Sequence, residues 1–133
     1  MKNQVLTIEQ MLELEELGID TSISSMFWYT DGRFKQLIPC FNQDTISDWT
    51  NQHGEKCIIP TFTLQDILDM LPKSIMHSNK QLKTCNYKLC TFDNKVMYTF
   101  NSFEQCWLKC THGKNLLEAA FNMLKWCKEN NFI

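Results

Sequence analysis

A two-residue turn constrains the fold of this chain more than any other feature. Asp93-Asn94 separates two segments of alternating apolar residues, 81–92 and 95–101. A two-residue loop at this point sets Leu89 opposite Tyr98. The other expected cross-strand pairs are Tyr87–Phe100 and Thr91–Val96. The apolar residues of both strands then share one face, so the turn and the hydrophobic pattern agree on one register.

Capping residues and apolar stripes predict three helices around these strands. The first covers residues 8–17, begins with a capping box of Thr7 and Gln10, and ends at Gly18 in a left-handed conformation. The second begins after Thr63 and stops at Pro72, with a core stripe of Leu64, Ile67, Leu68 and Leu71. The third runs from a capping box of Asn115 and Glu118 to about Asn130.

A second hairpin is predicted over residues 24–39, with Asp31-Gly32 as its turn. This register sets Trp28 opposite Lys35 as a stacked surface pair. Residues 41–56 are polar and predict a long loop or a short irregular helix. Residues 57–59 predict a short strand that Pro60 limits to a sheet edge or a strand end.

Residues 73–77 and 104–110 complete a three- or four-stranded meander. In the last strand, simple alternation places Cys106, Leu108 and Cys110 on one side and Trp107 and Lys109 on the other. The expected fold class is α+β, in the order α-β-β-α-β-β-β-α. Its sheet is largely antiparallel, formed by the hairpin and the meander, and three helices pack on it.

The length of 133 residues predicts a single domain over residues 1–133. The chain has 44% hydrophobic residues and a net charge of −2, which excludes a disordered chain and a strongly basic tail. No stretch is long enough for a membrane span, and the first residues lack the apolar segment of a secretion signal. We therefore expect a cytoplasmic protein without membrane contact.

The seven cysteines predict reduced, packed thiols better than a disulfide framework, because their number is odd and no signal peptide precedes them. Thiol or zinc chemistry at Cys106, Cys110 and His112 is the least favoured function, since Cys-x2-Cys spacing is missing. No phosphate loop, catalytic motif or cofactor motif is present. The sequence therefore predicts neither an enzyme nor a cofactor.

Charge is distributed unevenly along the chain. Residues 1–71 carry a net charge of −7 and residues 72–114 a net charge of +5. The meander, 73–114, could bind nucleic acid or another polyanion through Lys88, Lys95 and Lys109. The favoured interpretation is that these lysines cover the solvent-exposed face of a sheet whose other face is buried. Modules that bind nucleic acid specifically are usually rich in arginine, and this chain has Arg33 as its only arginine.

Two tryptophans indicate a candidate surface for binding a protein. Trp28 and Trp107 fall opposite the expected core face, so either helices cover both faces of the sheet or these side chains mark a contact patch. Trp28, Lys35 and Trp107 are the candidate contacts for a protein partner.

Two segments carry a resemblance. Residues 59–72 place an aromatic strand with Pro-Thr before an amphipathic helix, and residues 115–127 include Leu-Glu-Ala-Ala at the start of the last helix. In this respect the chain resembles small uncharacterised proteins encoded by phages and prophages of gut bacteria, and it is similar in plan to the phage α/β/α-sandwich domain. The resemblance implies a fold and a source, and it brings no active site. We expect a non-enzymatic accessory protein that binds an unknown host or phage protein.

Overall fold

The computed structural model describes residues 5–30, 35–39, 58–78, 84–100 and 107–133. The chain divides into two compact units, Met1–Asp66 and Ile67–Ile133, and the single domain remains a prediction. No helix within the described residues is long and apolar enough to cross a membrane. The expected loop 41–56 lies outside the described residues.

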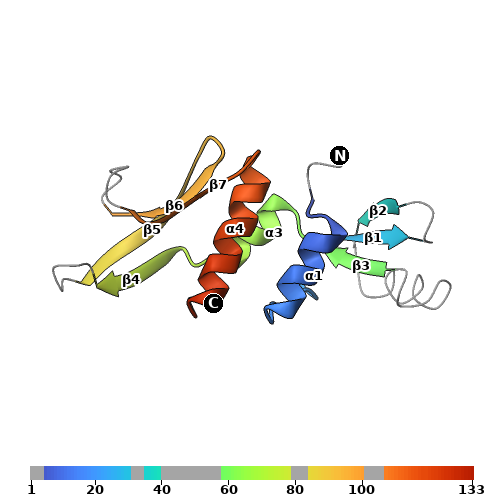
Figure 1. The fold of residues 1–133 in the computed structure, drawn as a ribbon, viewed down its shortest axis with the longest axis horizontal. Coiled ribbons are helices and arrows are strands. Elements are labelled where there is room, and N and C mark those ends of the chain that lie inside the picture. Colours follow the sequence, from blue (N-terminus) through green and yellow to red (C-terminus); the bar gives the residue numbers. More distant parts are fainter. Residues whose placement is uncertain (1–4, 31–34, 40–57, 79–83, 101–106) are drawn as a thin grey trace. The chain divides into compact units, whose positions relative to one another are not determined.

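The fold class and the order of elements are confirmed, and the strands belong to two antiparallel sheets (Figure 1). The elements of the first unit are α1 (Ile8–Glu16), β1 (Met26–Thr30), β2 (Lys35–Pro39) and β3 (Ile58–Thr61). The division between the units falls within α3 (Leu64–Met70). The second unit continues with β4 (Ser74–Ser78), β5 (Thr84–Phe92), β6 (Lys95–Thr99), β7 (Trp107–His112) and α4 (Leu116–Glu129).

The predicted caps of α1 are confirmed. The Gln10 amide donates to Thr7 Oγ1 over 3.2 Å, and the Thr7 amide donates to Gln10 Oε1 over 2.9 Å. Gly18 has a φ of 87°. The amide of Ile19 then donates to the carbonyl of Leu14 over 3.1 Å, which closes the helix as a Schellman motif.

The first sheet has the order β2-β1-β3, so Pro60 lies on an edge strand as predicted. The predicted register of the hairpin is wrong by two residues, because Trp28 pairs with Leu37 and Lys35 pairs with Thr30. A shift of two residues leaves every side chain on its predicted face, so the hydrophobic pattern could not distinguish the two registers. The predicted stacked pair of Trp28 and Lys35 is therefore not formed.

One carbonyl joins the segment before α1 to this sheet. The Leu6 carbonyl accepts a 2.9 Å hydrogen bond from Trp28 Nε1 and a 2.7 Å bond from Thr61 Oγ1. The Leu6 amide donates to the carbonyl of Phe62, directly after β3, over 3.0 Å. Trp28 is thus partly buried and serves the internal structure of the first unit.

The second sheet has the order β4-β5-β6-β7. The predicted turn is confirmed: Asp93 has a φ of 52°, and Leu89 pairs with Tyr98. Thr91 pairs with Val96 as well. Tyr87 and Phe100 form an edge-to-face ring contact with centroids 6.4 Å apart. Tyr98 and Val96 are fully buried, so this face is the core face of the unit.

Helix α4 packs on the core face against β6 and β7 (Figure 1). Asn115 caps it by accepting from the Glu118 amide over 2.9 Å. Thr111 Oγ1 donates to the carbonyl of Ala119 over 2.7 Å and links β7 to the helix. The Tyr98 hydroxyl donates to the carbonyl of Pro72 over 2.8 Å. These bonds fix the covered side of the sheet.

The hydrogen bond of Trp28 generates a first prediction. Trp28→Phe keeps an aromatic ring but removes the donor to Leu6, so the protein should lose about 1 kcal/mol of unfolding free energy. Urea denaturation measures the loss. The matched control is Trp107→Phe, which changes an exposed indole and should alter stability by less than about 0.5 kcal/mol. Equal losses in the two variants would contradict the role of the Leu6 carbonyl.

Candidate functional site

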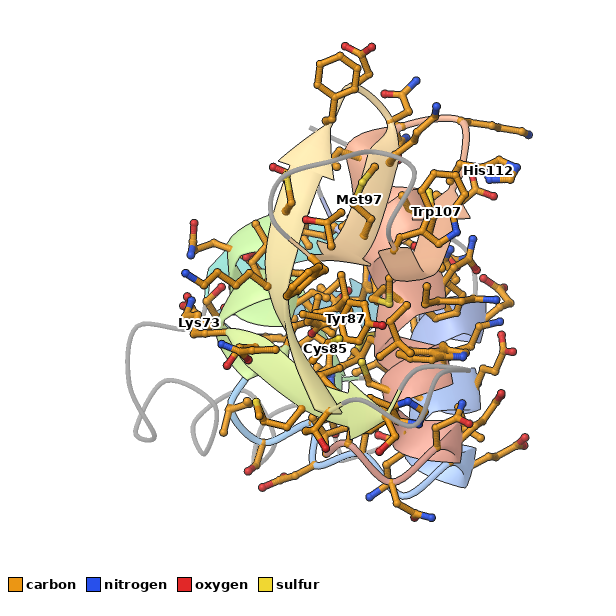
Figure 2. All side chains as sticks on the ribbon, turned by 90° about the vertical axis from the view of Figure 1, so that its left-hand side faces the viewer. Lys73, Cys85, Tyr87, Met97, Trp107 and His112 are labelled. Carbon is orange, nitrogen blue, oxygen red and sulfur yellow. The ribbon has the colours of Figure 1, made fainter. Side chains whose placement is uncertain are left out.

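The side of the second sheet opposite α4 is the candidate functional site, and we call it the outer face. Alternation along the strands and the cross-strand pairing assign its residues. Its paired rows are Phe92–Lys95–His112, Cys90–Met97–Cys110, Lys88–Thr99–Trp107 and Met76–Asn86. Figure 2 shows Trp107 and His112 on β7 and Met97 on the neighbouring strand β6.

Large apolar side chains are exposed on the outer face. Met76 is 63% exposed, Phe92 is 54% exposed and Trp107 is 50% exposed. Met97 and Thr99, on the inner strand β6, are 4% and 6% exposed. The face thus combines exposed apolar groups at its margins with a packed centre.

A β-bulge sets the side on which the residues of β7 lie. Tyr98 pairs with Lys109 but Thr99 pairs with Trp107, so Leu108 is an extra residue. Trp107 and Cys110 consequently share the outer face, which corrects the simple alternation predicted for this strand. Lys109 pairs with Tyr98 on the side of α4, also contrary to that alternation.

The structure separates the predicted site residues into groups. Trp28 and Lys35 belong to the first unit. Trp107, Lys88 and Lys95 share the outer face of the second unit. The three predicted anion contacts do not form one patch, because Lys109 lies on the opposite face from Lys88 and Lys95.

Sequence reasoning missed Phe92 and Met76 as surface residues. The signal for Phe92 was present, because it follows Thr91, which was assigned to the core face, and alternation therefore points Phe92 outward. The orientation of Met76 depends on the pairing of β4 with β5, where Met76 lies opposite Asn86. No turn of two residues fixes that pairing.

Only part of the predicted thiol or zinc site can be located. Cys106 lies outside the described residues. Cys110 and His112 lie on the outer face in adjacent rows. Within the described part of the chain, no group of three or more His, Cys, Asp or Glu residues could hold a metal ion.

A buried thiol and a buried phenol are in contact between α4 and the core face of the second sheet. The Cys127 thiol of α4 donates to the Tyr98 hydroxyl over 3.9 Å. Burial raises the pKa of the Cys127 thiol to about 11, although the hydrogen bond to Tyr98 lowers it in part. Burial, with a smaller effect of Cys127, also raises the pKa of Tyr98. Both groups are protonated at neutral pH, which suits packing and not nucleophilic attack.

Comparison with protein-family models, curated proteins and solved structures gave no match. Functional inference therefore rests on the geometry of the outer face.

The raised pKa of Cys127 predicts a loss of stability in alkali. Its ordinary value is 9.0 and its folded value about 11, so the folded state holds this proton more tightly than the unfolded chain does. The stabilising contribution is complete below pH 9 and is lost as pH rises through 11. Its size is roughly 1–3 kcal/mol.

Thermal unfolding between pH 8 and about pH 11.5 tests this linkage. Cys127→Ala should be less stable than the wild type at pH 8, because a buried group is removed, but its melting temperature should fall less steeply above pH 9. Parallel curves for the two proteins would show that Cys127 makes no contribution to the alkaline loss.

Proposed function

We propose that the protein is a non-enzymatic module that binds another protein through the outer face. The observation that carries the proposal is the half or greater exposure of Trp107, Phe92 and Met76 on one side of one sheet. Scattered apolar residues on a surface need no explanation, but several on one face are typical of an interaction site. Trp is also enriched among the residues that dominate binding energy.

Trp28, which the sequence suggested as a contact for a protein partner, is not part of the proposed binding surface. The indole of Trp28 is partly buried and donates to Leu6 within the first unit. Trp107 differs, because half of its side chain is exposed. The proposed contact therefore uses Trp107 and not Trp28.

Among the described residues, Cys127 is the cysteine with a shifted thiol pKa, and that shift does not support catalysis. A catalytic thiol needs a lowered pKa and access to substrate, whereas Cys127 is buried with a raised pKa. The remaining part of the proposal is that the module is an accessory protein of a phage or prophage acting in the host cytoplasm. Its support is the resemblance of residues 59–72 and 115–127.

Nucleic-acid or other polyanion binding is the second candidate, since Lys88 and Lys95 share the outer face with Trp107. It is less well supported because Lys109 lies on the opposite face. The aromatic rings also do not form a stacking platform: Phe92 and Trp107 lie two strands and two rows apart on the sheet.

The proposal predicts that Trp107→Ala and Phe92→Ala remove partner binding without unfolding the protein. Each change deletes an exposed apolar contact, so a partner should be retained at least about tenfold less. Affinity capture from bacterial lysate with quantitative mass spectrometry measures retention, and circular dichroism confirms the fold. Ile23→Ala is the matched control, because Ile23 is equally exposed in the first unit.

Two results would contradict this function. One is capture of the same proteins in the same amounts by wild type, Trp107→Ala and Phe92→Ala. The other is loss of a partner on Ile23→Ala alone, which would move the binding surface to the first unit.

A further inference from the structure

The outer face carries a diagonal band of apolar side chains. Phe92 on β5, Met97 on β6 and Trp107 on β7 lie in successive rows of successive strands. In the middle row Met97 is buried, and the accessible side chains are those of Cys90, which is exposed, and Cys110, which is half-buried. From the strand spacing and the rise per residue, the band from Phe92 to Trp107 is roughly 16 Å long.

Positively charged or protonatable side chains lie on both sides of this band. Lys95 and His112 occupy the row of Phe92, on the side toward β7. Lys88 occupies the row of Trp107, on the side toward β5. None of the assigned outer-face residues is acidic, although the whole chain has a net charge of −2. The local sign of charge therefore opposes that of the molecule.

We infer that the outer face binds an acidic amphipathic helix of a partner protein, an inference that rests on the proposed function. A band of roughly 16 Å matches about 11 residues of α-helix. Such a helix would place its apolar stripe on the exposed side chains of Phe92, Cys90 and Trp107 and its carboxylates beside Lys88 and Lys95. Helix α4 already covers the other face, and the partner helix would make the second sheet the middle layer of three.

The apolar part of the band favours a protein over a nucleic acid. The side chains of Cys90 and Cys110, between Phe92 and Trp107, offer polarisable apolar contacts that suit Leu, Ile or Phe. They offer no ring on which a base could stack. Two lysines on the face supply enough charge to orient an acidic helix, but little for a phosphate backbone.

Fluorescence titration of the 133-residue chain with three synthetic probes tests the inference. The first is a 12-residue Ala-based helical peptide with Leu at spacing i, i+3, i+7 and Glu only at positions that flank this stripe. The second has the same leucines with Lys in place of Glu, and the third is a 20-nucleotide single strand of deoxythymidine. The acidic peptide should bind at least about tenfold more tightly than the basic peptide, and its affinity should fall with added salt.

The double charge reversal K88E/K95E should weaken binding of the acidic peptide by about fivefold to tenfold or more. The matched control is K109E/K128E, which makes the same change in net charge at two lysines on the α4 side of the second sheet and should bind within about twofold of wild type. Trp107→Ala should weaken binding of the acidic peptide, because it shortens the band. The thermal melt of each variant confirms that it is folded.

The outcomes separate the two proposals. Equal affinity for both peptides, lost on Trp107→Ala, would overturn the acidic partner and leave protein binding at the outer face intact. Binding of the oligonucleotide without the acidic peptide would favour the polyanion alternative and overturn the inference. Binding of none of the three probes would also overturn it, whereas protein binding itself is judged by the capture experiment with Trp107→Ala and Phe92→Ala.

Discussion

The position of Tyr98 determines which face of the second sheet α4 covers. Its side chain is fully buried on β6, its hydroxyl donates to the carbonyl of Pro72, and the Cys127 thiol of α4 donates to it. Because adjacent residues of a strand point to opposite faces, Met97 and Thr99 must then face away from α4. Pairing with β5 and β7 extends this constraint across the sheet, so the outer face follows from one buried phenol.

The second sheet was predictable where two independent signals agreed. The loop of Asp93-Asn94 fixes a register by its length, and the apolar pattern fixes the same register by burial. The pairing of Leu89 with Tyr98 satisfies both. Helix α1 was predictable for a similar reason, because Thr7, Gln10 and Gly18 each satisfy backbone groups that a helix end leaves unpaired.

Prediction from the sequence was wrong or ambiguous where only one signal, the hydrophobic pattern, was available. In the first hairpin, the predicted and observed registers differ by two residues, and both keep Phe27 and Trp28 on the same faces. Trp28 itself was ambiguous, because a partly buried indole whose donor binds a carbonyl has the same sequence pattern as an exposed one. Its role depends on Leu6, a residue 22 positions away, and no local pattern encodes that contact.

The bulge at Leu108 is the reason that Trp107 can take part in the candidate site. Without an extra residue, Trp107 would continue the alternation of β7 and lie opposite Phe100, on the side of Tyr98 and α4. The bulge turns it to the outer face, in line with the tendency of bulges to redirect side chains near functional sites. A half-exposed indole leaves about 2–3 kcal/mol of burial free energy unrealised. A partner that covers Trp107 would recover this free energy, which connects an irregularity in one edge strand to the proposed binding function.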